Sequence, residues 1–144
     1  MSAGYIPIRS ELPADSLSAG SVSAVLNEIG SRLEILCSSG ESWRIDLRSL
    51  PFSAQERDRL KALLGQGEVV AHIAALGPSE LAETGYAGVW WVTHRNAEGA
   101  VVAELIEVTR VPDLLESPEQ DVRASLSRLQ GAIARCATLS EELP

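Results

Sequence analysis

The residues of this sequence that could perform chemistry are few and widely separated. His72 and His94 are its two histidines, and neither lies in an H-x-x-x-H or H-E-x-x-H pattern, which would bring ligands to one metal ion. Cys37 and Cys136 lie far apart and there is no C-x-x-C pair, so we expect no zinc or iron–sulfur site within one chain. We predict that both thiols are buried and unreactive, because unpaired cysteine is among the most buried residue types.

The two glycines in "LLGQGEV" (63–69) suggest a phosphate-binding loop, but the order of the elements excludes one. Phosphate loops run from a strand through glycines into a helix, whose N-terminal amides bind the anion. Here a predicted helix precedes Gly65 and Gly67 and a strand follows, so an anion would meet the electronegative end of a helix. The glycines fit a helix cap and a tight turn. Glu68 has no such backbone role and is therefore the better candidate for binding.

Pairs of carboxylates also occur, but nothing marks them as an acid and a base. Glu80 with Glu83, and Glu104 with Glu107, lie in or beside predicted strands. Glycosidase-type chemistry needs two carboxyl groups on the two sides of a cleft, and spacing in the sequence cannot establish that geometry. We predict solvated strand edges at these positions. We therefore expect no catalytic residue, no metal ligand and no cofactor.

The composition is that of a globular chain with a surplus of acid. Of 144 residues, 45% are hydrophobic and 22% are charged, and 12 Lys and Arg against 20 Asp and Glu give a net charge of −8. Nucleic-acid and anionic membrane surfaces require clustered basic residues instead. No apolar run approaches the roughly 18 residues of a membrane span, and the first residues lack the features of a secretory signal. We expect a cytoplasmic protein that binds neither nucleic acid nor membranes.

Three segments carry helical signals. Apolar residues recur over 21–37 at the spacing of one helix face, and Gly40 can end that helix. Ser53 and Glu56 form a capping box before a short leucine-containing helix. A C-terminal helix is expected over 117–142. Its apolar side chains form one narrow stripe, namely Val122, Leu126, Leu129, Ile133 and Cys136.

The remaining patterns predict strands. Apolar and polar residues alternate over 43–47, residues 67–76 form an apolar run, and 79–88 is a weaker extended stretch. Residues 89–95 and 100–108 flank the turn sequence "NAEG" and predict an antiparallel hairpin. We expect an α+β fold, with a mainly antiparallel sheet of four or five strands and helices packed largely on one face. The whole chain, 1–144, is expected to form a single domain in which 1–16 is an extended N-terminal segment.

The order of several motifs resembles the HupH/HyaF hydrogenase expression family. The likeness is carried by "RIDLRSLPFSAQERDRLKALLGQGEVVAHI" (44–73), "AETGYAGVWWV" (82–92) and "ELIEVTRVPDLLESPEQDV" (104–122), and an earlier "VLNEI" extends the family-like unit to 17–122. Longer members of the family look as if they hold two copies of this unit, whereas this chain has one. A homodimer would supply the second copy.

The resemblance implies an accessory chaperone in the maturation of [NiFe] hydrogenases, and not an enzyme. Such a protein would bind a hydrogenase subunit before that subunit is assembled or exported, and the iron–sulfur small subunit is the expected one. It would also bind other maturation proteins. An acidic chain would match a basic signal peptide on that subunit, and such binding would weaken as salt rises. Three other hypotheses stay open: an iron–sulfur or metal carrier in the same pathway, a small enzyme using a histidine, and a structural dimerisation module.

The adjacent Trp90 and Trp91 suggest where a partner binds, because neighbouring residues in a strand point to opposite faces. Trp90 matches the family motif, so we place it in the core under the helices and Trp91 on the open face, beside outward-pointing residues of the next strand. If both faces are covered, Trp91 belongs to the core instead. An exposed aromatic patch is typical of an interaction site. The predicted partner-binding residues, including polar or rigid positions at the rim, are Glu68, Glu83, Thr84, Trp91, Leu105, Glu107 and Pro112.

Overall fold

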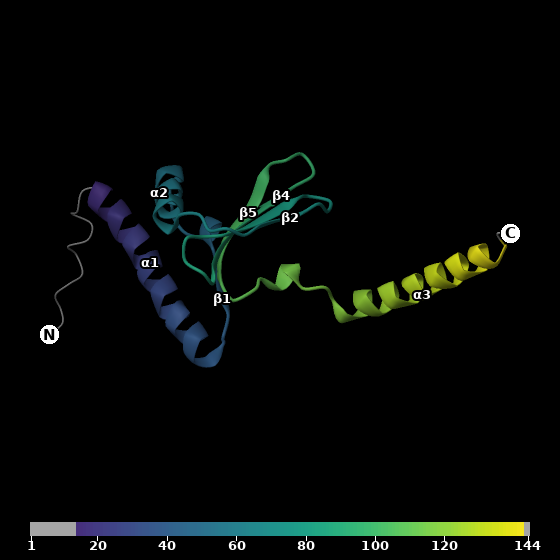
Figure 1. Ribbon diagram of the computed structural model, residues 1–144. Helices are drawn as coiled ribbons and strands as arrows, with labels where there is room; N and C mark the ends of the chain where they lie inside the picture. The colour runs from purple at the N-terminus through teal and green to yellow at the C-terminus, as the bar shows by residue number, and fades with distance from the viewer. Residues whose placement is uncertain (1–13, 143–144) are drawn as a thin grey trace. The chain divides into compact units, whose positions relative to one another are not determined.

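The structure, a computed structural model, describes residues 14–142, and side chains over 21–140. Its contacts divide the chain into two compact units, one ending at Arg110 and the other beginning at Val111. Within the described range, the first unit holds two α-helices and a five-stranded sheet, and the second holds a 3-10 helix and one long α-helix (Figure 1). Most of the expected N-terminal segment, residues 1–13, lies outside this range. The single domain stays a prediction.

The first helix, α1 (Ala14–Ser39), is longer than its apolar pattern predicts. It begins before residue 21, so residues 14–16 are helical and the extended segment 1–16 is wrong there. Gly20 does not delay the helix, because one glycine costs only about 1 kcal/mol relative to alanine. The predicted end is confirmed: Gly40 has a φ of 78°, and its amide donates to the Leu36 carbonyl at 2.9 Å.

The predicted capping box is present at the start of α2 (Ala54–Leu64). The Glu56 amide donates to Ser53 Oγ at 3.1 Å, and the Ser53 amide donates to Glu56 Oε1 at 2.8 Å. These bonds satisfy two amides that a first helical turn leaves unpaired. The strand before α2 is short, because residues after Asp46 form the 3-10 helix η2 (Leu47–Ser49).

The sheet is antiparallel throughout, with the strand order β1-β5-β4-β3-β2. The predicted hairpin is confirmed as its two central strands, joined by a turn in which Asn96 Oδ1 accepts from the Glu98 and Ala100 amides. The apolar run 67–76 contributes only four residues to a strand. The strands are β1 (Trp43–Asp46), β2 (Val70–Ile73), β3 (Ser79–Glu83), β4 (Val89–Arg95) and β5 (Val101–Val108).

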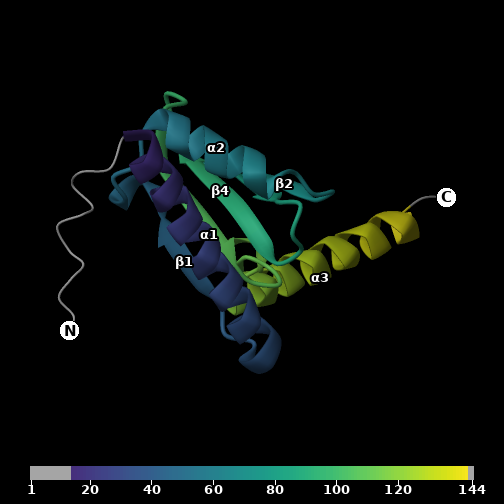
Figure 2. The same ribbon diagram turned by 90° about the vertical axis from the view of Figure 1, so that its left-hand side faces the viewer.

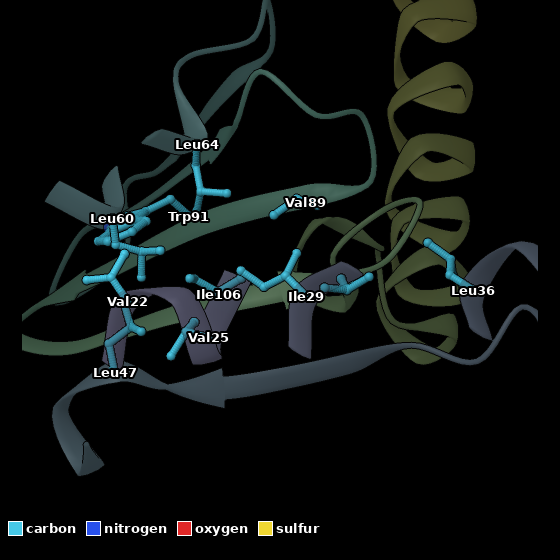
Figure 3. Packing of buried hydrophobic residues seen from close by; sticks show 11 residues of the cluster. Val22, Val25, Ile29, Leu36, Leu47, Leu60, Leu64, Val89, Trp91 and Ile106 are labelled. Carbon is cyan, nitrogen blue, oxygen red and sulfur yellow. The ribbon is translucent and has the colours of Figure 1, made fainter. Parts of the chain in front are cut away.

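The helices α1 and α2 lie on the same face of the sheet, as predicted (Figure 2). The α+β expectation is therefore confirmed. Buried apolar side chains from both helices, from η2 and from the strands β4 and β5 fill the space between them (Figure 3). The buried members of this core are Val22, Val25, Ile29, Leu36, Leu47, Leu60, Leu64, Val89, Trp91, Ile106 and Val108.

The predicted faces of the two tryptophans are wrong. Trp91 is 4% exposed and belongs to the core under the helices. Trp90 is equally buried but lies on the other face, where its Nε1–H donates to the Thr109 carbonyl at 3.2 Å. Leu105 pairs with Val92 and so shares the face of Trp90, not that of Trp91. Alternation along a strand establishes that the indoles diverge, but only packing decides which of them meets the helices.

The second unit contains η3 (Asp113–Leu115) and α3 (Glu119–Glu142), the predicted C-terminal helix. Four members of its apolar stripe are more than half exposed, namely Val122, Leu126, Leu129 and Ile133. Cys136 on this stripe and Cys37 on α1 are both exposed, so the prediction of buried thiols is wrong. In α1 the neighbouring Leu36 occupies the core position instead. No helix in the described part of the chain combines the length and the apolar character of a membrane span.

Candidate functional site

A groove of about 580 Å³ lies between the C-terminal half of α2 and the helix-facing side of β2 and β3. In Figure 2, β4 is in view between α1 and α2, and α2 lies beside β2. The described lining residues come from α2, the loop after it and three strands. They are Asp58, Lys61, Ala62, Gly65, Gln66, Gly67, Val70, Glu80, Ala82, Glu83, Thr84 and Trp91.

The loop 65–67 closes one end of the groove, and its glycines are required by backbone geometry. Gly65 ends α2 with a φ of 71°, and its amide donates to the Lys61 carbonyl at 3.0 Å. The Gly67 amide donates to the Glu83 carbonyl at 2.8 Å. A Cβ atom on Gly67 would stand 2.4 Å from the Thr84 carbonyl oxygen, so no other residue fits without a backbone shift. The loop is thereby held against the end of β3.

Trp91 forms the floor of the groove where it meets α2. The Lys61 ammonium lies 5.3 Å from the centre of the indole ring, a cation–π geometry. The indole Nε1–H points to Glu104 Oε2 at 3.4 Å, and Glu104 Oε1 accepts from Arg57 Nη1 of α2 at 3.3 Å. Because Lys61 and Arg57 both come from α2, these contacts tie the helix to β4, which carries Trp91, and to β5, which carries Glu104.

The described side chains of the groove carry a surplus of negative charge. Asp58, Glu80 and Glu83 line it together with a single cation, Lys61. Glu83 pairs with Trp90 and so belongs to the other face of the sheet, but it lies at the end of β3, where a Cβ atom on Gly67 would stand 3.3 Å from its Oε1. Glu80 lies 3.7 Å from His72 Nδ1, a contact that becomes an ion pair when the imidazole is protonated, and both side chains are substantially exposed. Carboxylates beside an indole and aliphatic side chains suit a ligand that has both basic and apolar groups.

The structure gathers three of the predicted partner-binding residues at the groove and separates the rest. Trp91, Glu83 and Thr84 line it. Thr84 is 3% exposed and closes a turn, since its Oγ1 accepts from the Tyr86 amide at 3.1 Å, so it is not a rim residue. Glu68 is exposed in the loop after α2.

Two further predicted residues lie elsewhere in the sheet, and one lies outside it. Glu107 pairs with Trp90 and Leu105 with Val92, so both are on the face opposite the groove. Pro112 is fully buried and precedes η3, which contradicts its expected place at a rim. Alternation along a strand divides its residues into two sets, one for each face of the sheet. It does not tell which set faces the helices, so the sequence alone could not predict these positions.

Sequence reasoning missed Asp58 and Lys61 as groove residues and left Glu80 without a role. Asp58, Lys61 and Gly65 recur at helical spacing along α2, a signal that places them on one side of the helix. Only the sheet register shows that this side of α2 faces β3, because the register places Glu80 and Ala82 on the same face as Trp91.

The other candidate groups for chemistry do not converge. His72 lies on the helix-facing side of the sheet, whereas His94 lies on the other side, where its Nδ1 is 2.6 Å from Ser79 Oγ. Among the residues that the structure describes, no three His, Cys, Asp or Glu side chains are grouped in a way that could hold a metal ion. The groove is therefore the candidate site, and its side chains suit binding.

Comparison with known proteins relates this groove to a family. A family model described as "HupH hydrogenase expression protein, C-terminal conserved region" matches residues 20–136, which include every residue of the groove. The chain belongs to this HupH family. The resemblance of the motifs over 44–122 is thereby confirmed.

Relatives of this HupH-family chain carry related names. It is 31% identical over 119 residues to the hydrogenase expression/formation protein HupQ of Azotobacter chroococcum mcd 1, covering 83% of this chain and 42% of the relative. It is 30% identical over 125 residues to HoxQ of Azotobacter vinelandii, covering 86% of this chain and 44% of that protein. The chain thus spans less than half the length of these curated relatives. Their names support a role in hydrogenase maturation.

A solved structure confirms the HupH fold. The hydrogenase expression protein HupH from Thiobacillus denitrificans ATCC 25259 superposes with a TM-score of 0.78 at 42% sequence identity. The match covers 81% of this chain and 97% of the solved chain. The α+β architecture that forms the groove is therefore shared with an experimentally determined member of the family.

Proposed function

We propose that this protein is a non-catalytic chaperone in hydrogenase maturation that binds a hydrogenase subunit in the groove beside α2. The observation that carries the proposal is the groove itself. It lies within the family-matched region and combines an indole floor with a surplus of carboxylates. Such a surface can hold a polypeptide, and the names of the relatives indicate hydrogenase maturation as the setting.

The subunit that fits best is the iron–sulfur small subunit, before it is assembled or exported. A subunit that awaits export carries a basic leader, and a groove lined by Asp58, Glu80 and Glu83 attracts basic residues. The net charge of −8 extends the same attraction to longer range at low ionic strength. The step would take place in the cytoplasm, where the subunit is still unassembled.

The test is affinity purification of the tagged protein from hydrogenase-expressing cells, with identification of the bound proteins by mass spectrometry. We expect the small subunit to be recovered, and the recovery to fall as salt in the wash is raised. A preparation in which the small subunit is no more abundant than in an untagged control would contradict the proposal. Recovery that does not respond to salt would contradict its electrostatic part.

A charge-reversal pair tests whether the groove is the binding site. Glu80→Lys places a cation in the groove and should strongly reduce recovery of the small subunit. Glu98→Lys makes the same change in the exposed turn between β4 and β5, outside the groove, and should leave recovery unchanged. Equal recovery with both variants would place the binding surface elsewhere. Iron analysis of the anaerobically purified protein separates a chaperone, which holds no iron of its own, from a metal carrier.

A further inference from the structure

Strand β2 forms one edge of the sheet, and in the described part of the chain it pairs with β3 on one side only. The Glu83 amide donates to the Val69 carbonyl at 2.8 Å. Backbone groups alternate in direction along an antiparallel strand, so residues 69, 71 and 73 face β3. It follows that Val70 and His72 direct their N–H and C=O groups away from the sheet. These two positions are a template for one more strand.

The side chains along this edge do little to protect it. Val69 is 46% exposed and Val70 is 52% exposed, and the His72 side chain is 70% exposed. Natural proteins usually block an exposed edge with lysine, proline or a covering element. Residues 69–73 contain neither lysine nor proline. An edge of this kind is what proteins use when they bind an extended peptide by strand addition.

The groove borders the same edge. Val70 and Glu80 both line it, and the register places them on the helix-facing side of the sheet. A strand added outside β2 would lie about 4.8 Å from it, with every second side chain on that side. Those side chains would reach the carboxylates of Glu80 and, across the groove on α2, Asp58. Lysine or arginine at alternate positions of the added strand would match this surplus of acid.

We propose that the β2 edge and the groove together bind one extended segment of a partner protein, with Lys or Arg at alternate positions, by strand addition. The inference rests on the proposed function, because the segment would belong to the bound hydrogenase subunit. The four residues of β2 limit the paired segment to a similar length, so one or two basic side chains enter the groove. An amphipathic helix could also fill a groove, but it would leave the outward amides of β2 unused.

The probe is a set of short overlapping synthetic peptides that covers the hydrogenase small subunit, and their binding to the full chain is measured by fluorescence anisotropy. We expect the peptides that bind to share alternate basic residues. Replacing each Lys or Arg by Gln should weaken binding roughly threefold per charge. If the intact subunit co-purifies but no peptide binds, or only peptides without alternate basic residues bind, the inference is overturned and the proposed function survives. If neither the subunit nor any peptide binds, both are overturned.

A proline substitution tests strand addition directly. His72→Pro removes an amide that faces solvent and keeps the bonds to β3, a position where strands tolerate proline. His72→Ala removes the same side chain but keeps the amide. We expect the proline variant to bind the peptide about two- to tenfold more weakly than the alanine variant, the usual range for one hydrogen bond. Equal affinities would overturn strand addition and indicate a helical ligand. N-methylation of the peptide amides that face β2 makes the same comparison with the wild-type protein.

A second pair of variants tests the carboxylates. Asp58→Asn combined with Glu80→Gln should weaken binding of the basic peptide roughly three- to tenfold and flatten its dependence on salt. Glu98→Gln, in the turn outside the groove, is the matched control and should change neither quantity. An unchanged salt dependence in the double variant would show that the basic residues do not meet the groove, which overturns the inference.

Discussion

Replacing Trp91 by alanine should destabilise the protein strongly, because the structure places this indole in the core. The side chain is 4% exposed and packs among residues of α1, α2 and the neighbouring strand. Removing a buried tryptophan or phenylalanine side chain typically costs about 3–5 kcal/mol. The contacts with Lys61 and Glu104 would be lost as well. They should add little, since the cation is exposed and the hydrogen bond is long.

Urea denaturation followed by far-ultraviolet circular dichroism measures this loss. With a slope of about 2 kcal/mol per molar urea, typical of a protein of this size, the midpoint should fall by roughly 1.5–2.5 M. The free energy of unfolding of natural domains is about 5–15 kcal/mol, so the variant should still fold, with a much smaller margin. The Trp43→Ala variant is the matched control, because Trp43 is only half-buried and its loss should cost clearly less.

A loss below about 1 kcal/mol for Trp91→Ala would refute this reasoning. It would mean that the indole contributes little to the core and would restore the hypothesis that Trp91 faces a partner. A loss equal to that of Trp43→Ala would contradict the structure in a different way, since the two sites would then be equally buried. Only a larger loss at Trp91 agrees with the observed packing.

Two further substitutions test how the groove is formed. Gly67→Ala should lower the free energy of unfolding by about 1–3 kcal/mol, because the new Cβ would stand 2.4 Å from the Thr84 carbonyl oxygen. The same change at Gly30, in the interior of α1 with nothing within 4 Å, should be neutral or stabilise by up to about 1 kcal/mol, and equal effects at the two glycines would contradict the close approach of the loop. Ser53→Ala removes the side-chain cap of α2 and should cost about 1 kcal/mol. Thermal denaturation of each variant checks these values, and an unchanged midpoint for Ser53→Ala would show that the cap contributes nothing.

The elements that could be predicted from the sequence are those whose signals are local. The capping box at Ser53 and Glu56, the glycine that ends α1 and the hairpin around "NAEG" each depend on a few consecutive residues, and all are present. The predicted roles of Gly65 as a helix cap and of Gly67 in a tight turn are also confirmed. The structure adds a steric constraint at Gly67, where a Cβ atom would stand 2.4 Å from the Thr84 carbonyl oxygen. The family resemblance rests on such local motifs as well.

The candidate site could be predicted only in part, because its residues meet through long-range pairing. Trp91 and Glu83, two predicted partner-binding residues, line the groove, but the expectation that Trp91 shares an open face with Leu105 is wrong, because Leu105 lies on the opposite face. Alternation predicts that neighbouring side chains in a strand point to opposite faces of the sheet. Either set of side chains could still be the one that faces the helices. The contacts of α1 and α2 with the sheet decide which face lies under the helices. The sequence of a single strand contains no information about these contacts.

One residue that lines the proposed binding groove is a buried tryptophan. Trp91 is a core residue, 4% exposed, and it also lines the groove, where the Lys61 ammonium lies 5.3 Å from the centre of its ring. The exposed residues Asp58 and Glu80 carry charge at the groove, whereas the backbone hydrogen bonds of Gly65 and Gly67 hold the loop at its end in place. A rigid floor with charged walls loses little conformational entropy when an extended segment binds. Changes in the walls should therefore alter affinity for the partner, and changes in the floor should alter stability first.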